Sequence, residues 1–334
     1  MKPLSPNRRE FLRLSAATLT GTVLGGWGMA ELNGLEADAP ERPAQDRVNV
    51  PPMTITTASG VRLHAIQTGS LSIRRTHRYM TGPESLRLPA ILLDPTWTEP
   101  LPMLAWVIEH PEGLILIDVG EQAAASNPSR YLEREPGIAW FVAHHFRLWV
   151  NASEEIGPQL RSLQLDPNDV RWVVSTHLHF DHVGGLKHFP NAKCLVSKLE
   201  FERRPNGAAP STWPAWYKPE LIEYRNTNLE TFPKSLALTK AGDVHLVPTP
   251  GHTDGHQSVI FNDGTRNYFF AGDAAFSQAR LLKREVAGIV ADVGATRQTL
   301  GRILGFAQAR PTVFLPTHDP ESMLRLQTQQ TLFA

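Results

Sequence analysis

The stretch THLHFDHVGG, residues 176–185, carries three histidines and one aspartate within six positions: His177, His179, Asp181 and His182. It follows the apolar run VRWVV, which is typical of a buried strand. Residues i and i+2 of an extended tip point the same way, so His177 and His179 can hold one ion, with Asp181 and His182 near a second position. Imidazoles and carboxylates are ligands of zinc and similar divalent metals, whereas crowded imidazoles gain little in a polar turn. The stretch therefore predicts a metal site at the end of a strand.

Three more residues of the same chemistry also follow apolar runs. His252 comes after VHLVPT, Asp273 ends YFFAGD, and His318 follows TVFLPT. Ligand sites in α/β proteins form where strand ends meet at one edge of a sheet. We therefore expect these three residues to join the first four.

Eight of the 13 histidines are assigned no ligand role. His256 lies four residues after His252, at the start of the next strand-like run, and is interpreted as support for the site. His144 and His145, in FVAHHFRLW, are interpreted as a solvated or packed helix face.

Short runs rich in Val, Ile, Leu and Phe recur along the chain, bounded by Gly, Pro, Asp or Asn. Helices are predicted around residues 156–165 and 295–310, the latter with an apolar face. This alternation predicts a mixed α/β domain, with a pair of sheets and helices outside them. The segment 201–232 is less regular and carries aromatic residues (Trp213, Trp216, Tyr217 and Tyr224). It is interpreted either as a lid that forms an apolar pocket or as a hydrophobic cluster that anchors a surface loop.

Composition limits the classes of partner. The 334 residues contain 33 Lys and Arg and 33 Asp and Glu, so the net charge is zero. A neutral chain without basic runs has no general attraction to nucleic acid or to anionic membrane. Nucleic acid and anionic membrane are therefore not expected as partners.

The N-terminus resembles a bacterial twin-arginine export signal, because Arg8 and Arg9 precede Phe11 and Leu12 and a weakly apolar stretch. The apolar run is shorter than the ~20 residues of a membrane span. We expect a signal in residues 1–39, a linker in 40–50, a hydrolase domain in 51–334, and a periplasmic or secreted protein. The single cysteine, Cys194, allows no disulfide within the chain.

The motifs H-x-H-x-D-H, G-H, G-D and a late histidine resemble the metallo-β-lactamase-fold hydrolases over roughly residues 50–334. The resemblance implies an αββα sandwich with a two-metal site at one edge. It implies one metal held by His177, His179 and His252, and a second held by Asp181, His182 and His318. Asp273 would bridge the two ions, which are expected to be zinc.

HPEGLILIDVG, PTPGHTDGHQSVIF and FLPTHD are similar to stretches of the N-acyl homoserine lactonases. That resemblance implies that Asp118 supports the metal ligands. The sequence differs from these lactonases at one position. They usually have Tyr three residues after the bridging Asp, whereas this chain has Phe276. Either another group, such as Tyr217 or Tyr224, replaces the hydroxyl, or the substrate differs.

The expected reaction is hydrolysis of a lactone or ester by a metal-bridged hydroxide, with Asp273 and Asp181 as catalytic residues and Asp181 passing a proton to the leaving alkoxide. A phosphotriesterase or another ester hydrolase of the same fold is the alternative. A noncatalytic metal-binding scaffold is disfavoured because all seven ligand positions are intact.

Overall fold

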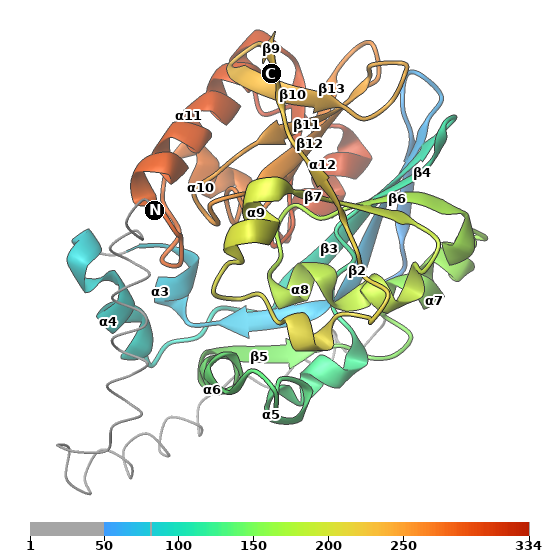
Figure 1. Cartoon of the computed structure of the whole chain (residues 1–334). Coiled ribbons are helices and arrows are strands. Elements are labelled where there is room, and N and C mark those ends of the chain that lie inside the picture. The colour runs from blue at the N-terminus through green and yellow to red at the C-terminus, as the bar shows by residue number, and fades with distance from the viewer. Residues whose placement is uncertain (1–49, 81, 334) are drawn as a thin grey trace, which may run out of the picture.

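The structure is a computed structural model that describes residues 50–80 and 82–333. Two β-sheets face each other, and helices cover their outer faces (Figure 1). This confirms the αββα sandwich. The predicted signal segment 1–39 and residues 40–49 of the predicted linker lie outside the described residues.

The first sheet has the strand order β1-β2-β3-β4-β6-β7-β8, and β5 pairs with β2. Its central strands are buried on both faces, as their near-continuous apolar sequences predict. β4, β6, β7 and β8 run parallel to one another, so their carboxyl ends share one edge. The strands are Met53–Thr56 (β1), Arg62–Ile73 (β2), Leu101–His110 (β3), Gly113–Ile117 (β4), Phe146–Trp149 (β5), Val170–Val174 (β6), Lys193–Ser197 (β7) and Glu220–Ile222 (β8).

The second sheet has the order β14-β13-β12-β11-β10-β9. Only β13 and β14 are parallel, and α11 connects them, as a parallel crossover requires. The strands are Arg225–Leu229 (β9), Phe232–Ala237 (β10), Val244–Pro248 (β11), Gln257–Asn262 (β12), Asn267–Gly272 (β13) and Thr312–Pro316 (β14).

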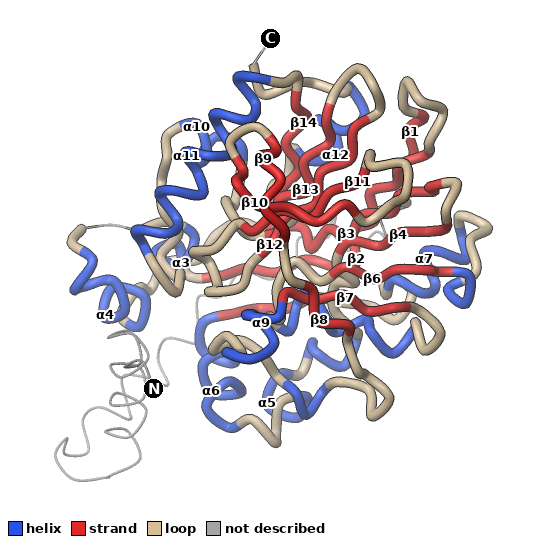
Figure 2. Tube along the Cα trace, turned by 45° about the horizontal axis from the view of Figure 1, so that its top comes forward, coloured by secondary structure: helices blue, strands red, loops and turns tan. Residues whose placement is uncertain are grey.

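One apolar core fills the space between the sheets, including Trp106 of β3 and Phe270 of β13. The strands run through the middle of the molecule, with α10 and α11 on one side and α5, α6 and α9 on the other (Figure 2). The helices are Arg75–Arg78 (α3), Arg87–Leu92 (α4), Pro128–Tyr131 (α5), Pro136–His145 (α6), Ile156–Ser162 (α7), Phe180–Val183 (α8), Lys198–Arg203 (α9), Gln278–Leu282 (α10), Val293–Ala309 (α11) and Ser322–Thr328 (α12), with short 3₁₀ turns at Glu84–Leu86, Ala123–Ser126, Pro167–Asp169, Gly184–His188 and Pro210–Thr212.

Two features of the sequence stabilise the long helix α11: a capping residue and an apolar face. The side chain of Asp292 accepts a hydrogen bond from the Ala295 N–H at 2.8 Å, so it caps the first turn. The apolar face predicted for residues 295–310 is buried against the second sheet, with Leu300 and Ile303 fully covered. The helices predicted at 156–165 and 295–310 are both confirmed.

The structure corrects the interpretation of segment 201–232 as one irregular loop. It contains β8 and β9, of which β8 extends the first sheet beside β7 and β9 forms a hairpin with β10. β9 has the sequence RNTNL and is largely exposed, so it lacks the apolar pattern that identifies a strand. His144 and His145 end α6, where His145 is packed among aromatic rings, so the helix-face interpretation is confirmed.

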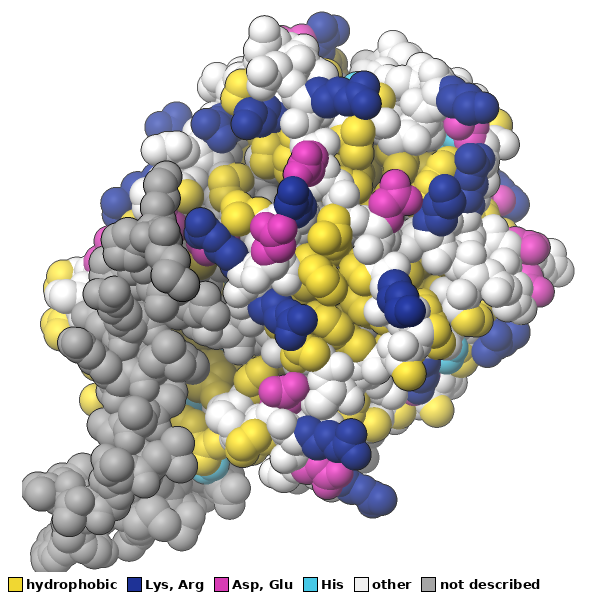
Figure 3. Space-filling view, in the orientation of Figure 1, with side chains coloured by type: hydrophobic (Ala, Val, Ile, Leu, Met, Phe, Trp, Pro, Cys, Tyr) yellow, Lys and Arg dark blue, Asp and Glu magenta, His cyan; other side chains and the backbone are white. Residues whose placement is uncertain are grey.

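Acidic and basic side chains are interspersed with apolar ones on the face shown in Figure 3. Within residues 50–80 and 82–333, no helix is long and apolar enough to span a membrane.

Gly120, in the turn after β4, is a position where we expect a substitution to destabilise the protein. Gly120 has φ +60°, and an added Cβ would lie 1.8 Å from Thr68 Oγ1. We expect Gly120→Ala to lower the free energy of unfolding by about 2–4 kcal/mol, because both the backbone and the packing oppose a side chain. Gly60 has φ +83° but open space around it. Gly60→Ala should therefore lower the free energy of unfolding by only about 1 kcal/mol, with both variants measured by urea titration. Equal losses in the two variants would contradict the packing argument.

Candidate metal centre

The seven side chains predicted to bind metal lie together at one edge of the two sheets. His177, His179, Asp181 and His182 follow β6 and enter α8. Gly272 of β13 is in register with Pro316 of parallel β14, and this places Asp273 beside the turn that carries His318. All of the seven are buried except His179, which is half-buried.

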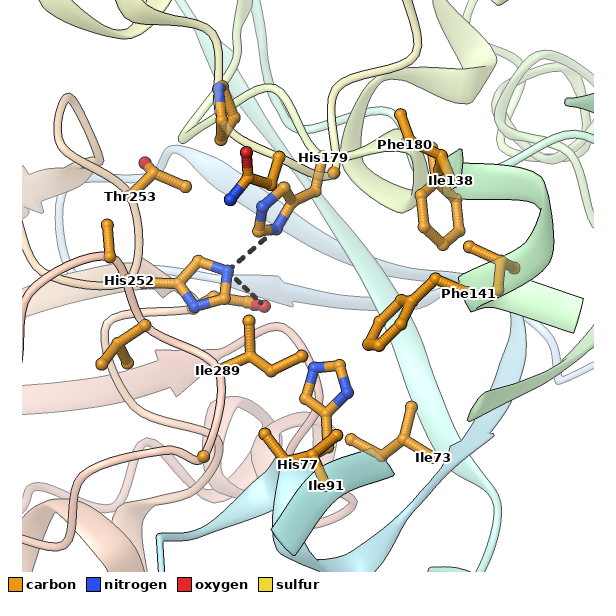
Figure 4. A pocket seen from close by; sticks show the side chains of 18 of the residues that line it. Ile73, His77, Ile91, Ile138, Phe141, His179, Phe180, His252, Thr253 and Ile289 are labelled. Carbon is orange, nitrogen blue, oxygen red and sulfur yellow. Dashed lines mark hydrogen bonds and ion pairs between the residues drawn. The ribbon is translucent and has the colours of Figure 1, made fainter. Parts of the chain in front are cut away.

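The first group of ligand atoms consists of three imidazole nitrogens. His179 Nδ1 lies 2.9 Å from His177 Nε2 and 3.0 Å from His252 Nε2. Figure 4 shows a nitrogen of the His179 ring directed toward a nitrogen of the His252 ring at one end of a cavity. Three imidazole nitrogens that converge in this way match one face of a tetrahedral metal site.

The second group combines imidazoles with carboxylates. His318 Nε2 lies 3.4 Å from Asp181 Oδ2 and 3.5 Å from Asp273 Oδ1, and His182 Nε2 lies 3.4 Å from the same Asp273 oxygen. The other oxygen of Asp273, Oδ2, lies 3.5 Å from His252 Nε2 in the first group. Asp273 therefore faces both groups, which is the arrangement a bridging carboxylate needs.

Hydrogen bonds behind the rings determine which nitrogens are free. His182 Nδ1 lies 2.7 Å from Asp118 Oδ2, and His318 Nδ1 lies 2.8 Å from the Pro102 carbonyl. Because these acceptors hold the N–H of Nδ1, each Nε2 is the nitrogen that would bind a cation at the centre once it has lost its proton. His182 Nε2 and Asp273 Oδ1 are buried and have no hydrogen-bond partner among the described residues. A set of imidazole nitrogens and carboxylates arranged in this way fits a pair of divalent cations.

Burial and charge act in opposite directions on the histidines. Burial lowers the pKa of His179 to about 4 and that of His252 to about 3, so both rings are neutral near pH 7, as metal ligands must be. Burial also disfavours the charged form of His318, but Asp273 and Asp181 outweigh it and raise its pKa to about 10. Without metal, a proton on His318 offsets part of the carboxylate charge.

Asp118 holds one side of the centre, in the supporting role implied by the resemblance. It directly follows β4, has φ +55° and accepts hydrogen bonds from Thr176 N–H at 2.7 Å and Thr176 Oγ1 at 2.8 Å, in addition to His182. His256 supports the other side, because its Nε2 accepts the Asp273 N–H at 3.1 Å. Both residues orient ligands and do not face the cavity.

Sequence reasoning missed Glu200, a buried residue of α9. Its carboxylate accepts hydrogen bonds from Leu178 N–H at 2.9 Å, Thr253 Oγ1 at 2.7 Å and Gly255 N–H at 3.1 Å. It thereby joins the loop of His177 and His179 to the loop of His252. Burial raises the pKa of Glu200 to about 7, although the three donors favour the charged form. No motif marks this residue, since its partners are mainly backbone groups.

The centre opens into a cavity of about 410 Å³, and five of the seven ligand candidates contribute to its wall: His179, Asp181, His252, Asp273 and His318. The rest of the wall is largely apolar and includes Ile73, Ile138, Phe141 and Ile289 (Figure 4). A cavity of this size and polarity accommodates a small organic molecule with an apolar arm.

The aromatic residues of segment 201–232 do not form this cavity. Trp213 and Tyr217 pack on the core outside the first sheet, and the Tyr224 hydroxyl donates to Gln257 Oε1 at 2.7 Å. The cluster interpretation therefore holds for these aromatics, although Arg203 to Gly207 do line the cavity. Neither tyrosine can replace a hydroxyl at position 276, where Phe276 lies in the cavity wall and stacks on His318 at 5.6 Å between ring centroids.

Comparison with known proteins agrees with this geometry. The sequence model of the Metallo-beta-lactamase superfamily matches residues 98–318. The N-acyl homoserine lactonase AttM of Rhizobium radiobacter is 24% identical over 248 residues, covering 70% of this chain and 88% of the relative. An N-acyl homoserine lactonase of a Bacillus species is 30% identical over 172 residues, covering 52% of this chain and 60% of the relative.

Solved structures show the same fold. An N-acyl homoserine lactone hydrolase with the product N-hexanoyl-L-homoserine bound at its catalytic metal centre gives a TM-score of 0.63 at 20% identity, covering 81% of this chain and 96% of that one. The hydrolase AbOPH of the beta-lactamase superfamily gives 0.52 at 18% identity, covering 81% and 91%. The chain belongs to the metallo-beta-lactamase superfamily. With its donor set intact, it is a metal-dependent hydrolase.

Because Glu200 joins two loops that carry ligand candidates, we expect the isosteric variant Glu200→Gln to lower both stability and zinc affinity. Glu200→Gln replaces one accepting oxygen by an NH₂ group that faces buried donors. We expect a loss of about 1–3 kcal/mol in the free energy of unfolding and about a 10–100-fold loss in zinc affinity, measured by urea titration and chelator competition. Glu202→Gln, an exposed change on the same helix, is the control and should alter neither quantity. Unchanged zinc affinity in Glu200→Gln would contradict the positioning role.

Proposed function

We propose that the protein is a zinc-dependent lactonase that opens N-acyl homoserine lactones, and hence a quorum-quenching enzyme. The observation that carries the proposal is the apolar cavity whose wall includes five of the seven ligand candidates. It allows the ester group of a substrate to reach the ligands while an acyl chain lies against Ile and Phe side chains. The lactonases among the relatives support the same substrate class.

The residues of the chain hold the cofactor and the substrate. Five imidazoles and two carboxylates form a donor set typical of zinc. Two divalent ions held there would supply a Lewis acid and lower the pKa of water toward about 7. Asp273 faces both ligand groups and would share its two oxygens between them.

Asp181 is assigned the proton transfer. Its carboxylate lies in the cavity wall, and its Oδ2 is 3.4 Å from His318 Nε2. When the acyl–oxygen bond of the lactone breaks, the ring oxygen leaves as an alkoxide and needs a proton. The oxygen of the attacking water bonds to the acyl carbon as that bond breaks. The Asp181 carboxylate takes a proton from the water and delivers it to the ring oxygen, and the products are the carboxylate and hydroxyl groups of the opened ring.

A direct test uses residues 40–334 loaded with zinc. We expect hydrolysis of N-hexanoyl homoserine lactone that is lost on chelation and restored by zinc, measured by the acid released. Asp273→Ala should lower kcat at least about 10³-fold while the circular dichroism spectrum persists, because one carboxylate serves both ligand groups. Asp169→Asn, at an exposed 3₁₀ turn, should retain full activity.

Two outcomes would contradict this assignment. Full activity of Asp273→Ala would exclude the bridging role. Turnover of an aryl phosphotriester with no lactone opening would show that the chain is a phosphotriesterase, the alternative that Phe276 keeps open.

We also propose that the protein is exported through the twin-arginine route, since Arg8, Arg9, Phe11 and Leu12 match that signal. In a bacterium with this route, we expect the full chain in the periplasmic fraction and the Arg8→Lys/Arg9→Lys variant in the cytoplasmic fraction. Arg42→Lys, in the predicted linker, should not change the distribution. Equal distribution of all three chains would contradict the signal assignment.

A further inference from the structure

His77 is a buried histidine that the proposed reaction does not use. It belongs to the short helix α3, lies in the cavity wall and is only 6% exposed. Its ring meets the edge of Phe146 at 5.0 Å between centroids and lies 6.4 Å from Phe141. Figure 4 shows the ring projecting into the cavity between Ile289 and Phe141, with Ile73 and Ile91 close by.

The imidazole lacks the polar partners that a buried histidine normally has. Nδ1 is inaccessible to water and has no hydrogen-bond partner among the described residues. An unsatisfied buried nitrogen is destabilising, and a Phe or Leu side chain would suit this apolar wall better. Because Nδ1 is closed to solvent, the nitrogen that a ligand in the cavity would meet is Nε2, which also has no hydrogen-bond partner among the described residues.

The backbone holds this ring in position. The His77 carbonyl accepts the Gly288 N–H at 2.9 Å, and the preceding residue, Thr76, donates its N–H and its hydroxyl to Asp94 Oδ2, each at 2.7 Å. An added Cβ at Gly288 would lie 1.7 Å from the Thr76 carbonyl oxygen, so the two segments are in close contact. The ring is therefore presented by a fixed segment.

His77 lies beyond the metal centre, along the apolar arm of the cavity. Phe276 separates the two, because its ring lies 5.6 Å from that of His318 and 6.3 Å from that of His77. A substrate whose ester carbonyl reaches the ligands thus brings its next functional group toward His77. In an N-acyl homoserine lactone, that group is the amide on the carbon beside the lactone carbonyl.

The chemistry of the two groups matches. Burial, together with the nearby His252 and His145, lowers the pKa of His77 to about 3. A neutral imidazole offers one N–H donor and one acceptor nitrogen, and a secondary amide offers the complementary acceptor and donor. A polar group among apolar and aromatic neighbours contributes to specificity, because a substrate without a partner leaves it unpaired.

We infer that His77 is a substrate-binding residue that hydrogen-bonds to the amide of an N-acylated lactone, so that the enzyme selects amide-bearing lactones over alkyl lactones. This inference rests on the proposed lactonase function.

The test compares two substrates and four chains, all loaded with zinc. The substrates are N-hexanoyl homoserine lactone and a γ-lactone that carries an alkyl chain of similar length and no amide. The chains are the wild type, His77→Phe, His77→Gln and the control His145→Phe. His145 is also buried and contacts Phe141, but it does not line the cavity.

We expect His77→Phe to lose about ten-fold in kcat/KM on the amide substrate, mostly through KM, and to retain activity on the alkyl lactone. His77→Gln keeps a donor and an acceptor and should recover part of the loss. The Tm of His77→Phe should not fall below that of the wild type, since no hydrogen bond is removed. The control should show no change in substrate preference.

Two results would overturn the inference alone: an equal loss on both substrates, or no loss on either. If the wild type opens neither lactone, the proposed function itself fails, and this inference fails with it. Calorimetric binding of N-hexanoyl homoserine, the opened product, provides a readout without turnover. It should weaken in His77→Phe and not in the control, and equal binding by the two variants would also overturn the inference.

Discussion

The rest of the structure is organised around one cluster, in which the fold brings five imidazoles and two carboxylates together with their metal-binding atoms directed toward one another. Such a cluster opposes folding unless cations occupy it, because buried acceptors without donors are destabilising. The protein holds the cluster through strand register and through polar groups behind the ligands. Asp118 orients His182 and binds Thr176, while Glu200 joins the loops that carry the first three histidines.

The cavity follows from this arrangement. The ligands lie where the strands of both sheets end, and α3, α6 and the loop before α11 enclose the space beyond that edge. Those segments supply mainly apolar side chains, so that the polar chemistry is concentrated at the centre. His77 is the polar residue within the aromatic part of the wall. Its unsatisfied nitrogen lowers stability, and the proposed hydrogen bond to the substrate amide accounts for its presence there.

Much of the centre could be predicted from the sequence, because its residues come shortly after apolar runs that form strands. His252, Asp273 and His318 each follow an apolar run, and the sheets bring those ends together regardless of their separation along the chain. The αββα fold followed from the family resemblance, whereas the residues alone indicated only paired sheets with outer helices.

Other features carried no signal in the sequence. Glu200 and His77 lie on short helices, and their importance depends on contacts with distant segments. β8 and β9 were not recognised within segment 201–232, because these short, exposed edge strands lack the apolar alternation that identifies a strand. A substrate contact by Tyr217 or Tyr224 was one of two alternatives, and the sequence could not decide between them because an aromatic composition does not reveal which core a side chain joins.

The most direct test of the account is the number of zinc ions bound per chain, measured by elemental analysis of the dialysed, zinc-reconstituted protein. The arrangement of Asp273 between two ligand groups predicts two ions per chain. A value of one or none would contradict the dinuclear centre.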